Sequence, residues 1–157
     1  MLEGKFPVEV PADFNNWEGE IVCAMFSAWD TAGEEGYARI KTLGYPNTDM
    51  FFFIFSVVNR PSFVNTLDRW YVEIRHHCPR VPLLLVGTKS DLRGKGKEEI
   101  TREEIDARVL ELGAIGYVEC SAMYGTGLRE IIDTAISYLE RNIPEKKQKK
   151  KQNCSVM

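Results

Sequence analysis

The chain has 157 residues, of which 44% are hydrophobic and 27% are charged. This composition supplies enough apolar side chains for the packed core of one ordinary domain. No apolar run approaches the roughly 18 residues that a membrane helix needs, and the cysteines match no zinc or disulfide framework. We therefore do not expect a multidomain enzyme, a secreted disulfide scaffold or a spanning membrane protein.

The net charge of −3 is unevenly spread along the chain. Residues 145–157 contain five lysines and one glutamate, so the rest of the chain is acidic. This distribution argues against nucleic acid as a partner, since the basic surface would then lie on the folded domain. A basic tail suits an anionic membrane surface, and the alternative is a solvated tail that only aids solubility.

Four apolar runs predict strands, and three of them lead into polar loops. The predicted strands are residues 21–29, 51–58, 83–86 and 117–120. Their hydrophobicity is continuous rather than alternating, which is typical of strands buried on both faces of a parallel sheet. The polar loops that follow them are 30–33, 87–91 and 121–123.

Three helices are predicted between and after these strands. Ser62 is the expected cap of the first helix, which ends near Cys78. Thr101 and Glu104 form a capping box for the second helix, and Gly113 ends it. The third helix spans about residues 128–142, and the side chains expected to face inward are Leu128, Ile131, Ala135 and Leu139. Alternating strands and helices predict an α/β doubly wound, mostly parallel sheet, with ligands at the carboxyl ends of its strands.

The loop Asp30-Thr31-Ala32-Gly33 suits a nucleotide phosphate. The carboxylate of Asp30 can hold Mg²⁺ through water, and Gly33 lets its backbone N–H approach the terminal phosphate. Taken alone, such a tetrapeptide is also compatible with a simple turn.

The two other loops suit a guanine base. The carboxylate of Asp91 can accept hydrogen bonds from the ring N–H and the amino group of guanine, while the stem of Lys89 can cover the purine. Backbone N–H groups of Ser121, Ala122 and Met123 can meet the guanine carbonyl oxygen. Taken alone, the Thr88-Lys89-Ser90-Asp91 motif is also compatible with an aspartate that caps a helix.

Together and in this order, these motifs resemble the Rho/Rac family of small GTPases in the Ras superfamily. The segments that carry the resemblance are 29–33, 44–49, 70–79, 81–89 and 117–122. The resemblance implies the small G-protein fold, GTP/GDP and Mg²⁺ as cofactors, and roles in signal transduction and actin organisation. It assigns nucleotide binding to Asp30, Thr31, Ala32, Gly33, Thr88, Lys89, Asp91, Ser121, Ala122 and Met123, and it implies effectors, exchange factors and GTPase-activating proteins as partners.

The C-terminal residues Cys154-Ser155-Val156-Met157 resemble a prenylation box, with a last residue that favours farnesyl. The lysine run before it supplies the second signal that stable membrane attachment needs. We expect lipidation of Cys154 and attachment to the cytoplasmic face of the plasma membrane, with a cytosolic pool.

One departure from the family pattern concerns the phosphates. The given sequence has no GxxxxGK[ST] loop before Asp30, and the strand before that loop and the helix after it are also missing. We therefore expect residues 1–144 to form an incomplete small-GTPase domain of low stability, and residues 145–157 to form the polybasic lipidated tail.

Two single positions also depart from the family pattern. Ala12 stands where the switch threonine that binds Mg²⁺ is expected, and Glu34 stands at the position of the catalytic glutamine. An ionised glutamate accepts hydrogen bonds but donates none, so fast hydrolysis is not expected. Three interpretations stay open: a GTPase whose sequence lacks its beginning, a degenerate GTPase that binds partners without nucleotide, and a non-functional product.

Overall fold

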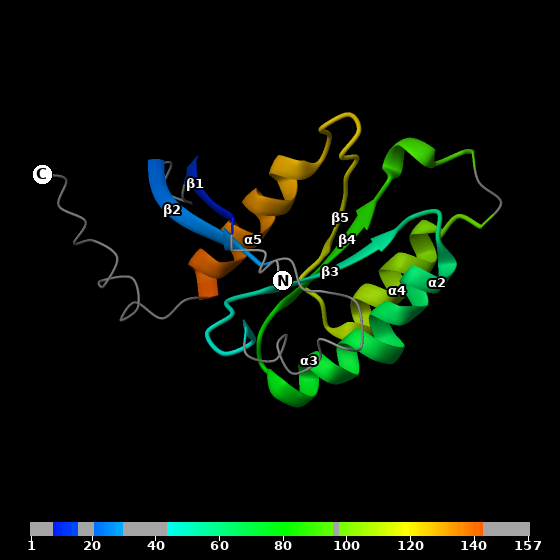
Figure 1. The fold of residues 1–157 in the computed structure, drawn as a ribbon, viewed down its shortest axis with the longest axis horizontal. Helices are drawn as coiled ribbons and strands as arrows, with labels where there is room; N and C mark the ends of the chain where they lie inside the picture. Colours follow the sequence, from blue (N-terminus) through cyan, green and yellow to red (C-terminus); the bar gives the residue numbers. More distant parts are fainter. Residues whose placement is uncertain (1–7, 16–20, 30–43, 96–97, 143–157) are drawn as a thin grey trace, which may run out of the picture.

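The computed structural model describes residues 8–15, 21–29, 44–95 and 98–142 (Figure 1). The predicted phosphate loop 30–33, the degenerate position Glu34 and the lipidation site Cys154 lie outside these ranges. The N-terminal described segments form strands β1 (Val8–Asn15) and β2 (Ile21–Ala28), which pair antiparallel in a two-stranded sheet. Ala12 lies within β1, opposite Ala24. The position where the switch threonine is expected therefore lies in a strand in this structure.

The second sheet is parallel and has the strand order β3-β4-β5. These strands span Phe51–Ser56, Leu83–Thr88 and Tyr117–Glu119. The central strand β4 is buried from Leu83 to Gly87, because it has a paired neighbour on each edge and a helix layer on each face. The prediction of a parallel sheet is thus confirmed for the runs 51–58, 83–86 and 117–120. The apolar run 21–29 is predicted to behave in the same way, but it contributes β2 to the separate antiparallel sheet.

Helical structure runs from Arg60 to His77 in three joined pieces. These are α2 (Arg60–Asn65), a π-helical segment (Thr66–Tyr71) and α3 (Val72–His77). The prediction that Ser62 caps this helix is wrong. Asn59 is the cap, since its side chain accepts the Ser62 N–H at 2.8 Å, and Pro61 then falls in the first turn, where no intrahelical N–H is needed.

The remaining helices are α4 (Arg102–Leu112) and α5 (Leu128–Asn142). The capping box of α4 and the left-handed Gly113 at its end are confirmed. The bounds of α5 also agree with the prediction, but Leu128 does not face inward: it is 43% exposed, because it opens the helix directly after the exposed loop 122–126. Among the described residues no helix is both long and apolar enough to cross a membrane.

Alternate residues of the parallel strands build two apolar cores, one on each face of the sheet. Phe53, Phe55, Leu83 and Leu85 face α2, α3 and α4, whereas Leu84, Val86, Val118 and Cys120 face α5. Figure 1 shows α5 and the other helices on opposite sides of the sheet. This doubly wound arrangement brings the loops after β4 and β5 to one edge of the sheet.

Within the described part of the chain, β3 pairs with β4 and with no other strand. Ile54, in the middle of β3, is 61% exposed, although its sequence neighbours Phe53 and Phe55 are buried. Phe52 lies on the same face as Ile54 and stacks with Phe26 of β2, with ring centroids 6.1 Å apart. No described strand joins β2 to β3, and the expectation of low stability stays a prediction.

Candidate functional site

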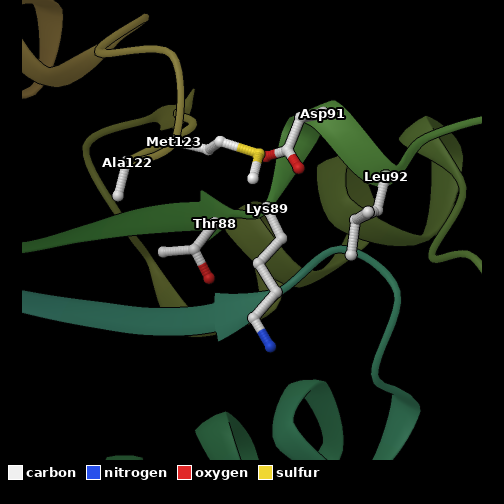
Figure 2. A pocket seen from close by; sticks show the side chains of 6 residues that line it. All are labelled: Thr88, Lys89, Asp91, Leu92, Ala122 and Met123. Carbon is white, nitrogen blue, oxygen red and sulfur yellow. The ribbon is translucent and has the colours of Figure 1, made fainter.

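A cavity of about 470 Å³ opens where β4 and β5 end. Figure 2 shows side chains from both loops around it. The lining residues are Thr88, Lys89, Asp91, Leu92, Ala122 and Met123. All of them except Leu92 are residues that the sequence motifs predict, so the structure brings two separate motifs together at one place.

Asp91 lies in a short 3-10 turn, Ser90–Leu92, directly after β4. The hydroxyl of Ser121 donates to Asp91 Oδ1 at 2.5 Å, and the Ser90 N–H donates to the Cys120 carbonyl at 3.2 Å. No described residue donates a hydrogen bond to Asp91 Oδ2. The turn is therefore tied to the end of β5, with acceptor capacity of the carboxylate left for a ligand.

Both the side chain and the backbone N–H of Ser121 are engaged within the protein. Its side chain is buried, and its backbone N–H donates to the Thr126 carbonyl at 3.0 Å, so this N–H is engaged within the loop. The N–H groups of Ala122 and Met123 have no acceptor among the described residues. The donors that the loop offers to a ligand are thus those of Ala122 and Met123, while Ser121 holds Asp91.

Lys89 adopts the left-handed backbone conformation, with φ +61°. This conformation is disfavoured for a residue with a Cβ atom and is found where surrounding structure imposes it. The bonds on either side impose it here: the Thr88 hydroxyl donates to the Phe55 carbonyl at 3.0 Å, and Ser90 is bound to Cys120. As a result, the Lys89 side chain runs past the end of β3 beside the cavity (Figure 2).

An ion pair that the motifs do not predict connects the segment after β4 to strand β5. Arg93 Nε donates to both carboxylate oxygens of Glu119 at 2.9 Å, and Arg93 Nη1 donates to the Ile100 carbonyl at 2.9 Å. The Tyr117 hydroxyl donates to Glu119 Oε1 at 2.7 Å. The hydrogen bonds from Arg93 lower the pKa of Glu119, and burial raises the pKa of Tyr117.

The cluster also constrains the strand beneath the cavity. A Cβ atom on Gly87 would lie 2.2 Å from the Tyr117 hydroxyl oxygen and 2.8 Å from Val57 Cγ1. Only glycine fits there without displacing side chains. The one sequence signal for this cluster is a glutamate inside an apolar strand, which requires a cationic partner when it is partly buried.

Comparison with known families agrees with this geometry. The sequence model of the Ras family matches residues 13–141, which is most of the chain. The chain belongs to the Ras family of small GTPases. Members of the family generally bind GTP/GDP and Mg²⁺ and act with regulators and effectors.

The described site of this Ras-family protein fits the base of a guanine nucleotide. It offers a carboxylate acceptor, two backbone donors and a lysine stem around one cavity. For Mg²⁺ the described residues supply no comparable set, since none of them form a group of three His, Cys, Asp or Glu side chains that could hold a metal. Asp30, the expected Mg²⁺ residue, lies outside the described ranges.

Proposed function

We propose that this Ras-family chain binds guanine nucleotides and acts as a GTP/GDP switch of the Rho type. The observation that carries the proposal is the placement of Asp91, held by Ser121, opposite the backbone donors of Ala122 and Met123. Guanine presents a ring N–H and an amino group to a carboxylate and a carbonyl oxygen to N–H donors. At the corresponding positions adenine has a ring nitrogen without a proton and an amino group. Its acceptor would therefore face the carboxylate of Asp91, and its donor would face the N–H groups of Ala122 and Met123.

The walls of the cavity support the same base. Leu92 and Met123 are apolar side chains from opposite loops, and the stem of Lys89 adds aliphatic surface. Apolar side-chain surface in the lining suits a purine ring, which gains from burial of its faces. The proposed arrangement therefore combines stacking from side chains with base selection by Asp91.

The experiment that tests the proposal is a titration of the purified full chain with fluorescently labelled GDP in the presence of Mg²⁺. We expect unlabelled GDP and GTP to compete and ADP to have no effect at the same concentration. Removal of Mg²⁺ by a chelator should weaken binding, since Asp30 is proposed to hold the ion through water. Absence of binding in a chain that unfolds cooperatively would contradict the proposal.

Hydrolysis is proposed to be slow. Asp30, Thr31, Ala32 and Gly33 are assigned to the metal and the terminal phosphate, and Glu34 follows them at the catalytic position. A glutamate there adds negative charge near the terminal phosphate and cannot donate a hydrogen bond to it. Measured release of phosphate from bound GTP should therefore rise when Glu34 is replaced by glutamine.

A second candidate function is a partner-binding module that holds no nucleotide. Ala12 and Glu34, which replace residues that serve Mg²⁺ and hydrolysis, are the observations that favour it. A cooperative thermal transition together with no GDP binding would support this alternative. No cooperative transition at all would instead support a non-functional product.

The tail is proposed to attach the protein to a membrane. Cys154 is the proposed site of a farnesyl group, and the five lysines before it would add attraction to anionic lipids. Such attachment would place the protein and its effectors at the cytoplasmic face of the plasma membrane, where a Rho-type switch acts on actin. The Cys154→Ser variant should fail to accept a farnesyl group from purified farnesyltransferase.

A further inference from the structure

We propose that Arg93 and Glu119 are positioning residues that set the preference for guanine by holding the Asp91 turn against β5. The inference rests on the proposed function of the cavity. Neither residue lines the cavity, and each would act through Asp91.

Two side-chain contacts join the turn after β4 to the end of β5, and the residues that make them are equally spaced in both segments. Glu119 and Ser121 are two residues apart at the end of β5, and Asp91 and Arg93 are two residues apart in the turn after β4. Ser121 bonds to Asp91 at 2.5 Å, and Glu119 accepts two hydrogen bonds of 2.9 Å from Arg93 Nε and a third from Arg93 Nη2. A backbone bond from the Ser90 N–H to the Cys120 carbonyl also ties the start of the turn to the end of β5. The two other bonds are made by Ser90 and Asp91, so without the Arg93–Glu119 pair the end of the turn that follows Asp91 would lose its tie to β5.

The ion pair between Arg93 and Glu119 is costly to break because both of its charges are partly buried. The Arg93 and Glu119 side chains are 29% and 28% exposed, and each makes a further hydrogen bond, to the Ile100 carbonyl and from the Tyr117 hydroxyl respectively. Removing either charge leaves the other partly desolvated and unpaired, which is the costly situation for such a pair. The pair therefore holds the turn more firmly than an exposed surface ion pair would.

The orientation of the Asp91 carboxylate matters most for the second hydrogen bond that guanine donates, the one from its amino group. Guanine offers a carboxylate both a ring N–H and an amino group, whereas hypoxanthine offers the ring N–H alone. A carboxylate that pivots loses the alignment that two parallel bonds require. Loosening the turn should therefore weaken GDP binding more than IDP binding, whereas general destabilisation would weaken both alike.

The test compares Arg93→Gln with Arg60→Gln in the full chain. Arg60 also makes an ion pair, with Glu104, through two contacts of 2.7 and 3.2 Å between α2 and α4, and neither residue lines the cavity. We expect Arg93→Gln to reduce the ratio of the IDP and GDP dissociation constants by about five- to tenfold, the effect of about one hydrogen bond. Arg60→Gln should leave the ratio unchanged, and Arg93→Lys should restore part of it.

A second measurement needs no nucleotide. Amide hydrogen exchange of residues 88–93 should be several-fold faster in Arg93→Gln than in the wild type, and unchanged in Arg60→Gln. If the wild type binds neither GDP nor IDP, the proposed function fails, and the exchange result still decides whether Arg93 holds the turn. Unchanged exchange in Arg93→Gln would overturn the inference, as would an unchanged ratio in a chain that binds GDP. Should that variant not fold, Glu119→Gln is measured in its place.

Discussion

The hydroxyl of Ser121 lies 2.5 Å from Asp91 Oδ1, so a residue after β5 holds the carboxylate of a residue after β4. The two residues are 30 positions apart in the chain. Their contact joins two loops into one cavity wall, and it gives the buried Ser121 side chain a partner.

Replacing Asp91 with asparagine should weaken GDP binding by about ten- to a hundredfold, because hydrogen bonds to a charged acceptor are lost. The same change should improve binding of XDP, since the asparagine amide donates a hydrogen bond to the additional carbonyl of xanthine. Competition titrations against labelled GDP measure both effects. Asp106→Asn, which changes an exposed carboxylate on α4, is the matched control and should bind as the wild type does.

Replacing Ser121 with alanine should lower the free energy of unfolding by about 1 kcal/mol, the usual net value of one hydrogen bond. GDP binding should weaken as well, because Asp91 loses the donor that orients it. Urea unfolding and GDP titration measure the two effects. Thr48→Ala removes an exposed hydroxyl bond to the Gly44 carbonyl and should leave GDP binding unchanged. A Ser121→Ala chain with unchanged GDP affinity would show that this contact has no part in recognition.

Gly87→Ala should destabilise the fold by about 1–3 kcal/mol, because the added methyl group overlaps Tyr117 and Val57. Gly44→Ala is the control, since a Cβ at that position meets no atom within 4 Å. Adding Tyr117→Phe to Gly87→Ala removes the atom at 2.2 Å and should recover part of the loss. Thermal unfolding followed by circular dichroism compares the variants. Equal melting temperatures for Gly87→Ala and Gly44→Ala would contradict the packing argument.

Lowering the pH should reduce the free energy of unfolding, in part because Glu119 becomes protonated. Arg93 lowers the pKa of this carboxyl in the folded protein, so the folded state favours the ionised form more than the unfolded state does. The resulting stability is present above the ordinary glutamate pKa of about 4.3 and is lost as pH falls through the lower folded value. The difference in free energy of unfolding between the wild type and Glu119→Gln should therefore be largest near neutral pH and should shrink below about pH 4. A difference that does not vary with pH would argue against ionic pairing.

Much of the fold can be predicted from the sequence, because continuous apolar runs allow few alternatives. Residues 83–86 are buried on both faces, as expected for the centre of a parallel sheet, and the capping box at Thr101 is a local motif that needs no tertiary information. The start of the first helix was predicted wrongly because both Asn59 and Ser62 can cap, and only the backbone decides between them. The π-helical segment Thr66–Tyr71 has no signal in the apolar spacing.

The candidate site likewise contains residues that the sequence predicts and contacts that only the structure shows. Asp91 and Lys89 follow a recognisable strand and carry their chemistry in a short motif, so they can be found without coordinates. The pairing of Arg93 with Glu119 joins positions 26 residues apart, and no local spacing predicts it. The hydroxyl of Ser121 is bound to Asp91, 30 positions away, and its N–H is bound to Thr126 within the same loop, and the short motif predicts neither contact. The assignments of Asp30, Gly33, Glu34 and Cys154 stay predictions.

The left-handed backbone of Lys89 has a consequence for the kinetics of binding. Its neighbours Thr88 and Ser90 are bound to the carbonyls of Phe55 and Cys120, so hydrogen bonds within the protein hold the bend. The entropy cost of ordering this turn then falls on folding rather than on association. A purine that enters needs no slow rearrangement of the turn, and its observed association rate should rise linearly with nucleotide concentration.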